Sequence, residues 1–143
     1  MRISELLEAK GSSVVTVSPE ATVGEVIGDL ARHNIGAVIV SRDGQRIDGI
    51  ASERDIVRAL DTDGAHLLGR AISAIMSTDV YCAAPADPVD SLMATMTTRR
   101  FRHVPILDQG KIVGIVSIGD VVKSRTDELE RDRALLVDYI GAR

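Results

Sequence analysis

The sequence is poor in cysteine and in aromatic residues. Cys82 is the only cysteine among 143 residues, so no disulfide can form within the chain, and we expect a reducing cytoplasm as its location. Aromatic residues make up 2% of the chain, so the core must be aliphatic and almost no ring is available to stack on a base. No apolar run approaches the length of a membrane span, and the charged N-terminus lacks the apolar region of a signal peptide. We therefore expect no membrane partner.

The residue patterns of common enzymes are also missing. We find no Ser/His/Asp or Cys/His set, no phosphate loop of the Walker type, and no cluster with metal-ligand spacing. The net charge of −4 argues against nucleic-acid binding, which depends on neutralising phosphates. We therefore expect no catalytic residue, no metal, no required cofactor and no nucleic-acid partner. An enzyme remains an alternative, which turnover of a bound nucleotide would support.

One seven-residue pattern occurs twice. Gly49–Asp55 reads GIASERD and Gly114–Asp120 reads GIVSIGD. Each copy follows a β-rich apolar run and precedes an apolar helical run, so we expect a strand to end at the glycine and a helix to begin at the serine. Glycine allows close approach of a backbone or a ligand, and a helix start favours phosphate. The aspartate can accept two hydrogen bonds from a vicinal diol such as ribose.

A purely structural interpretation of the same pattern is a capping box, in which Ser caps the helix and the acidic residue reaches back. Such boxes are common, so a single copy would favour that interpretation. Two copies in the same context, 65 residues apart, favour a duplicated binding unit.

The rest of the chain aligns in the same two copies. Matching positions include Pro19 with Pro85 and Gly44 with Gly110, and Ile3–Leu7 resembles Ile72–Met76. Each copy predicts a lead helix, a short strand, a helix, two strands and the Ser-capped helix. The predicted short strands are Val14–Val17 and Val80–Cys82. The predicted central helices begin after Thr22 and near Val89, and the later strands are Ala37–Val40, Ile47–Ala51, His103–Leu107 and Ile112–Val116.

The predicted fold is α/β of the α+β type, with two pseudo-symmetric repeats packed as one disc-like module and followed by a C-terminal helix. This tail, Lys123 to Ile140, is charged and carries a thin apolar stripe of Leu129, Leu136, Tyr139 and Ile140. Such stripes usually exist to be buried. We expect the stripe to dock on the protein's own domain or on a twin subunit, with a separate partner as the alternative.

The doubled motif, Gly-h-x-Ser-x-x-Asp-h with h apolar, resembles the end of each unit in a tandem pair of CBS domains, or Bateman module. The segments Ile35–Val40 and Phe101–Ile106 are similar to the central strand of that family. The resemblance covers about Ile3 to Lys123. It divides the chain into a first repeat (1–62), a connection (63–70), a second repeat (71–124) and a helical tail (125–143).

The resemblance implies a regulatory module with two clefts that hold an adenosine-containing ligand: AMP, ADP, ATP, a dinucleotide such as NAD, or S-adenosylmethionine. It implies a homodimer formed through the helices, and an unidentified protein partner that reads the ligand. It assigns a ribose to Asp55 and to Asp120, and ribose or phosphate contacts to the two motif serines. The implied pocket residues are Thr16, Gly36, Ala37, Ser52, Asp55, Arg102, His103, Ser117 and Asp120. Arg54 joins them as a candidate phosphate contact, because it precedes Asp55. A structural homodimer with empty clefts is the alternative function.

The two copies differ in charge. Arg54 precedes Asp55, whereas Gly119 holds the matching place before Asp120, so we expect phosphate binding, and any single occupancy, at Asp55. The basic run Arg99–His103 has three interpretations: a helix C-terminus suited to cations, a phosphate contact through Arg102 or His103, or nucleic-acid binding. Cys82 aligns with Thr16, so it is either near a pocket or a buried inert thiol.

Overall fold

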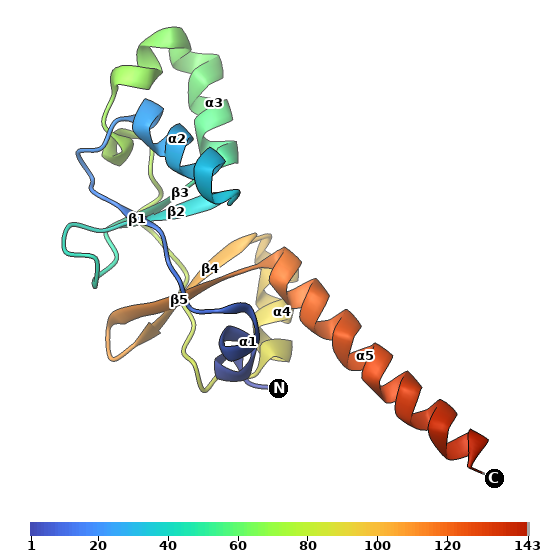
Figure 1. Cartoon of the computed structure of the whole chain (residues 1–143). Helices are drawn as coiled ribbons and strands as arrows, with labels where there is room; N and C mark the ends of the chain where they lie inside the picture. Colours follow the sequence, from blue (N-terminus) through green and yellow to red (C-terminus); the bar gives the residue numbers. More distant parts are fainter. Residues whose placement is uncertain (143) are drawn as a thin grey trace.

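The computed structural model describes residues 1–142, and Figure 1 shows two halves of similar build with one long helix leaving the second. The first half contains β1 (Thr16–Val17), α2 (Val23–His33), β2 (Ala37–Val40), β3 (Gly49–Ser52) and α3 (Glu53–Asp63). The second contains α4 (Val89–Arg99), β4 (His103–Asp108), β5 (Lys111–Ser117) and α5 (Ile118–Gly141). Ahead of each half lies a lead segment: α1 (Ile3–Lys10), or the short 3₁₀ helices η1 (Gly64–Gly69) and η2 (Ile72–Ala74).

The helix starts follow the capping chemistry of the sequence. The Thr22 hydroxyl accepts a hydrogen bond from the amide of Glu25 at 3.1 Å, which caps α2. Val23, Val26 and Leu30 are buried along one face of that helix, as their helical spacing predicts. The predicted helix from Thr22 to His33 and the predicted strand Ala37–Val40 are confirmed.

The two sheets are not equal. In the first half β1 pairs parallel with β2, and β2 pairs antiparallel with β3. In the second half β4 and β5 form an antiparallel hairpin, and the prediction of a strand at Val80–Cys82 is wrong, because this edge makes only a single bridge between Ala83 and Ile106.

Pro105 explains the missing strand. In the first half the amide of Ile39 donates to the carbonyl of Val15. Pro105 occupies the position equivalent to Ile39 and has no N–H to donate, so the matching bond cannot form. The next bond along the chain is kept, with the amide of Leu107 donating to the carbonyl of Ala83 at 2.9 Å.

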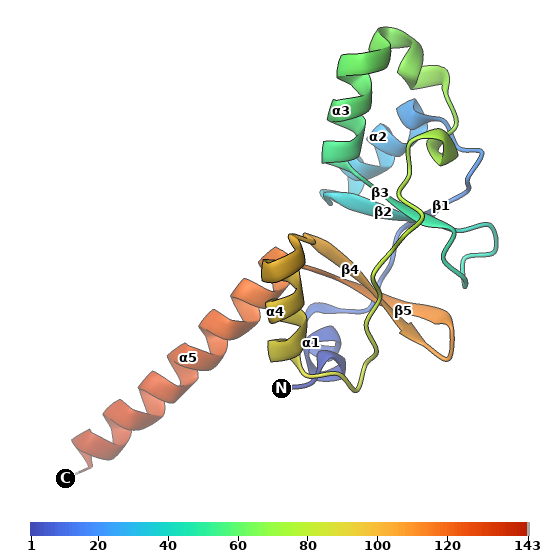
Figure 2. The ribbon, with the colours of Figure 1, turned by 180° about the vertical axis from the view of Figure 1, so that it is seen from behind.

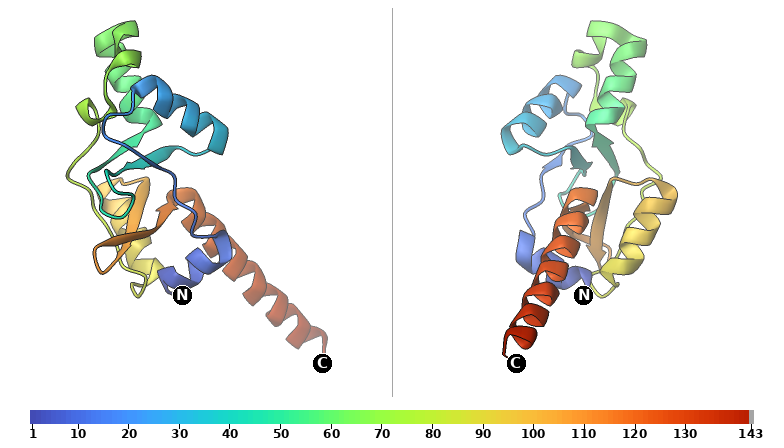
Figure 3. Two further views of the ribbon diagram at one scale, coloured as in Figure 1. Left: turned by 60° about the vertical axis from the view of Figure 1, so that its left-hand side comes forward. Right: turned by 90° about the vertical axis from the view of Figure 1, so that its right-hand side faces the viewer.

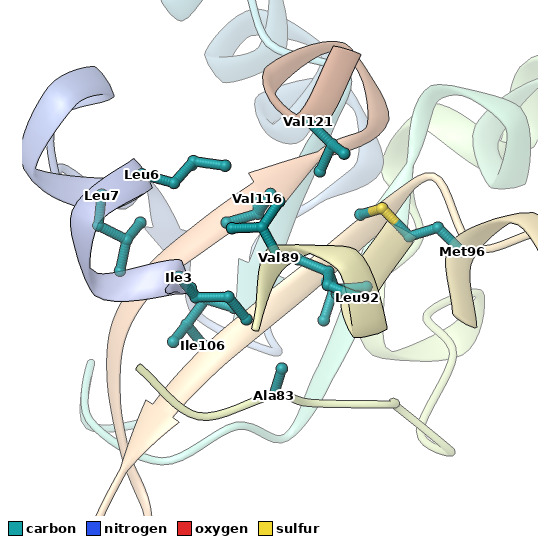
Figure 4. Close-up of a cluster of buried hydrophobic side chains, with 11 residues drawn as sticks. Ile3, Leu6, Leu7, Ala83, Val89, Leu92, Met96, Ile106, Val116 and Val121 are labelled. Carbon is teal, nitrogen blue, oxygen red and sulfur yellow. The ribbon is translucent and has the colours of Figure 1, made fainter. Parts of the chain in front are cut away.

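Each lead segment packs into the other half's core. Ile3, Leu6 and Leu7 of α1 are buried against the second half, beside Ile106 and Val116 (Figure 4). In exchange, η2 contributes Ile72 to the core of the first half. Figure 2 shows the connecting segment running from the first half down to the second. The two repeats are therefore interlocked, and neither half has a complete core of its own.

The motif glycines serve this exchange. A Cβ on Gly49 would come within 2.6 Å of the Met76 sulfur and 2.8 Å of the Ser77 carbonyl oxygen. A Cβ on Gly114 would come within 2.7 Å of the Leu7 side chain. Leu7 and Met76 are matched residues of the two lead segments. At both motif positions, glycine therefore makes room for the crossing segment.

The tail is not a separate helix. α5 begins at the Ser117 cap and runs without interruption to Gly141, and Figure 3 shows it projecting away from both halves. Leu129, Leu136 and Ile140 are exposed, so the expectation that the stripe docks on the protein's own domain is wrong for this chain by itself. No helix within residues 1–142 is both long and apolar enough to span a bilayer.

Candidate functional site

A cleft lies at Asp120, between the two halves. It has a volume of about 280 Å³. The second half contributes His103, Ser117 and Asp120, whereas the first half contributes Gly36 and Ala37 from the entry to β2. Lys10, at the end of α1, also lines it. Five residues of the predicted site are thus brought together here. Further lining residues are Ser13, Val15, Asn34, Ile35 and Ile115.

A second, wider cleft of about 760 Å³ lies at Asp55. Here the first half contributes the Ser52–Asp55 motif and the second half contributes the chain that enters β4. Predicted site residues in its lining are Gly36, Ser52, Arg54, Asp55, Arg102 and His103. The two clefts are therefore related by the repeat, and each combines the motif of one half with the β-strand entry of the other.

Both motifs form capping boxes, so the structural interpretation is confirmed. The amide of Ser52 donates to Oδ2 of Asp55 at 2.9 Å, and the amide of Asp55 donates to the Ser52 hydroxyl at 3.2 Å. At the other cleft the amide of Ser117 donates to Oδ2 of Asp120 at 2.8 Å. No hydrogen bond from residues 1–142 reaches the Oδ1 atom of either aspartate. Capping therefore orients each carboxylate and leaves one oxygen for a ligand.

The two carboxylates differ in their counter-ion. The Lys10 ammonium donates to Oδ2 of Asp120 and to the carbonyl of Ile115, both at 2.7 Å. Burial favours the neutral form of Asp120, but the hydrogen bonds from Lys10 and from the Ser117 amide outweigh it, so the pKa of Asp120 lies below its ordinary value. Within residues 1–142, no ion pair reaches Asp55.

His103 lies between the clefts and lines both. Its Nε2 atom would be 3.2 Å from a Cβ on Gly36, so the absence of a side chain at Gly36 makes room for the imidazole. Burial lowers the pKa of His103, and the charges of Asp120 and Glu53 oppose that effect only in part. At neutral pH the imidazole is therefore uncharged and offers one donor and one acceptor.

Cations concentrate around the Asp55 cleft. Four arginines line it: Arg54, Arg58, Arg100 and Arg102. The ion pairs formed within residues 1–142 involve none of them. The Asp120 cleft holds one cation, Lys10, which is already paired. The Asp55 cleft can therefore accommodate more negative charge than the Asp120 cleft.

Arg100 has an unusual backbone. It follows α4 with φ of 59°, in the left-handed region, and Asn34 holds the equivalent place after α2 with φ of 52°. Asparagine tolerates that conformation, whereas arginine is strained in it. The interpretation of Arg99–His103 as a helix C-terminus is confirmed, because α4 ends at Arg99. The same turn places Arg100 and Arg102 at the cleft.

Thr16 is the one predicted site residue that lines neither cleft. It pairs with Ile39 in the sheet, and Ser13 and Val15, on the preceding chain, line the Asp120 cleft in its place. Cys82 lines neither cleft and is half-buried, and burial raises the pKa of its thiol. Across residues 1–142 no group of three or more His, Cys, Asp or Glu side chains could hold a metal ion.

Sequence reasoning missed Lys10 and Arg100. Lys10 precedes both repeats' motifs and reaches its cleft only because α1 crosses to the second half. Arg100 belongs to a basic run that is evident in the sequence. Ile35 and Phe101 are matched residues of the two repeats, so the residues before them, Asn34 and Arg100, match as well. That match was the signal that could have placed Arg100 at a cleft.

Comparison with known proteins identifies the family. The CBS-domain family model matches residues 8–62 and again residues 72–127. The chain belongs to the CBS-domain family and carries two copies of the domain, as the resemblance of its motifs indicates.

Relatives of similar size exist in bacteria and archaea. The crystal structure of the CBS-domain protein ATU1752 from Agrobacterium tumefaciens superposes with a TM-score of 0.83 at 44% identity, covering 87% of this chain and 99% of that one. The CBS domain protein PAE2072 from Pyrobaculum aerophilum, complexed with AMP, has a TM-score of 0.74 at 31% identity and covers 84% of this chain and 89% of that one. YhcV from Bacillus subtilis is 31% identical over 93% of this chain and 94% of its own length.

Proposed function

We propose that the protein is a regulatory module that binds an adenosine-containing ligand and signals its presence to a partner. The observation that carries this proposal is the pair of clefts in which a capped aspartate from one repeat faces the β-strand entry of the other. The AMP complex of the similar archaeal CBS protein supports an adenosyl ligand.

In this proposal each aspartate holds the ribose diol through its open Oδ1 atom. Ser52 and Ser117 lie beside the ribose or the phosphate. The residues at the β-strand entries, Gly36 and Ala37 in one cleft and Arg102 and His103 in the other, surround the base. A neutral His103 suits this role, because it can both donate and accept a hydrogen bond at pH 7.

We further propose that the clefts differ in ligand charge. The four arginines of this cleft form no ion pair within residues 1–142, and they favour a phosphorylated nucleotide such as AMP, ADP or ATP at Asp55. The Lys10–Asp120 pair favours an adenosyl compound of low charge at the other cleft. The sequence predicts a phosphate contact from Arg54 alone, and we extend that contact to a group of four arginines.

Calorimetric titration with AMP, ATP, adenosine and S-adenosylmethionine tests the proposal. Asp55→Asn is the sharpest variant, because the amide oxygen can still accept the bond from Ser52 while the charge is lost. A charge-assisted contact contributes about 1.5–3 kcal/mol, so the affinity for AMP should fall about tenfold or more. The matched variant Asp120→Asn should leave binding of AMP at the Asp55 cleft unchanged.

The phosphate contact needs its own comparison. Arg54→Ala should weaken AMP and ATP and leave adenosine unchanged. Equal weakening of AMP and adenosine would show that Arg54 does not read phosphate. Wild-type protein that binds none of the four compounds would favour the alternative, a structural dimer with empty clefts. Steady turnover of a bound nucleotide would instead favour an enzyme.

A further inference from the structure

An apolar stripe runs along the whole of α5. It consists of Ile118, Val122, Leu129, Leu136 and Ile140, which are between 40% and 62% exposed. At 3.6 residues per turn these five positions fall within about 40° of one another around the helix axis. Val121, the buried residue by which α5 joins the core, points about 60° away from the start of the stripe. The stripe therefore faces outward along the full helix, from the cleft to the distal end.

The spacing of the stripe is palindromic. Successive members are separated by four, seven, seven and four residues. Two copies of the helix laid antiparallel, with Leu129 at the centre, therefore match every apolar residue with another. Ile118 meets Ile140 of the second copy, Val122 meets Leu136, and Leu129 meets Leu129.

We propose that α5 is an interaction surface for a second copy of this chain, and that two α5 helices pair antiparallel about Leu129. The partner is identified by this self-complementarity, because a two-fold interface requires that one surface match itself.

Charge separates the antiparallel arrangement from the parallel one. Arg125 lies at the edge of the stripe, about 40° from its centre line, and Asp132 lies on the same side, about 60° from that line. In the antiparallel pair Arg125, which is ion-paired with Glu128 of its own helix at 3.3 Å, also faces Asp132 of the second copy, and the symmetry makes that contact twice. In a parallel pair each edge of the stripe meets the opposite edge of the partner, so Arg125 and Asp132 of the two copies would not face each other. This contact between opposite charges is therefore available only to the antiparallel pair, which it favours over the parallel one.

The distal turn of α5 supports the same arrangement. Leu135 and Val137 are 68% and 58% exposed there and lie outside the stripe, so the last turns are apolar on several sides. In the antiparallel pair this end reaches the first turns of the partner's α5, where the partner's module begins. Leu135 and Val137 would therefore lie beside the partner's module, which can cover them.

The size of the contact follows from the length of α5. The 24 residues of α5 span about 36 Å, and a helix about 10 Å wide buries a footprint of roughly 360 Å² per chain. A standard interface buries about 800 Å² per partner. The helix pair therefore supplies about half of a standard interface, so we expect weak, concentration-dependent association.

Disulfide trapping tests the arrangement in the full chain. In a Cys82→Ser background, one protein carries Val122→Cys and a second, of different mass through a tag, carries Leu136→Cys. After mixing and mild oxidation, the antiparallel pair should give mainly the mixed disulfide. Disulfides within each variant and none between them would establish a parallel pair and overturn the proposal. The variant Asp127→Cys, on the opposite face of α5, measures random collision, and mixed product no greater than that background would also overturn it.

Light scattering provides a second readout. Leu129→Glu places two like charges together at the centre of the pair and should raise the dissociation constant at least tenfold. The matched change Arg131→Glu, on the far face, should leave the constant unchanged. Equal self-association of both variants would contradict the proposal. Nucleotide binding is not involved in either experiment, so failure here leaves the proposed function intact.

Discussion

The ammonium nitrogen of Lys10 lies 2.7 Å from Oδ2 of Asp120. The lead helix of the chain therefore supplies the counter-ion to the motif carboxylate of the second repeat. Asp55, the matching carboxylate of the first repeat, has no such partner within residues 1–142. Two sites that are alike in sequence thus differ in charge, and the difference comes from a residue outside the motif.

This ion pair predicts a dependence of stability on pH. The pKa of Asp120 is lower in the folded chain than its ordinary value, which is about 3.9. Its contribution to stability is therefore fully present above about pH 4 and is lost as the pH falls through the lower, folded-state pKa. Lys10→Met should reduce that loss. Thermal unfolding of both proteins at pH 7 and pH 2.5 measures it, and an identical decrease in Tm for the two would contradict the prediction.

The same substitution should affect ligand binding at the Asp120 cleft. Lys10 occupies an oxygen that a ribose hydroxyl could otherwise use, so Lys10→Met should tighten adenosine binding there. A gain of one neutral hydrogen bond contributes about 1 kcal/mol, or about fivefold in affinity. Calorimetry in an Asp55→Asn background isolates this cleft. Weaker binding of adenosine would mean that Lys10 contacts the ligand itself.

We predict that Arg100 lowers the free energy of unfolding and, in return, adds a positive charge to the Asp55 cleft. Replacing it with the residue of the other repeat, Arg100→Asn, should relieve the left-handed strain and raise the free energy of unfolding by about 1 kcal/mol. The same variant should bind AMP more weakly and adenosine as before. Denaturant unfolding and calorimetry give the two numbers. A variant that is no more stable than wild type would remove the argument from strain.

The two motif glycines should differ in their tolerance of a methyl group. At Gly49 the added Cβ meets the backbone oxygen of Ser77, which cannot move aside, and overpacking of this kind costs about 1–3 kcal/mol. At Gly114 it meets the end of the flexible Leu7 side chain. Gly49→Ala should therefore destabilise the fold more than Gly114→Ala. Urea unfolding of the pair checks the order, and the reverse order would contradict the packing described.

Much of the fold could be predicted because residues of the same type recur at matching positions of the two repeats. The Ser-capped helices, the α2 start at Thr22 and the strand at Ala37–Val40 all follow from local chemistry. The absence of a strand before Ala83 could not be predicted in this way. It results from the missing N–H of Pro105, which matters only once it is known that this segment would pair with β4. Lys10 could not be placed at a site from the sequence, because its position depends on which half α1 packs against. The continuity of α5 was likewise hidden, since nothing at residues 123–125 signals either a break or its absence.

The exchange of lead segments means that the unit of duplication is not the unit of folding. Cleavage in the exposed connection near Gly64 would yield one fragment that holds α1 and another that holds η2, each carrying a piece of the other's core. Such fragments should remain unfolded separately and recover structure when mixed. The intact chain should accordingly unfold in a single cooperative step, so that a disturbance at either cleft is felt by both.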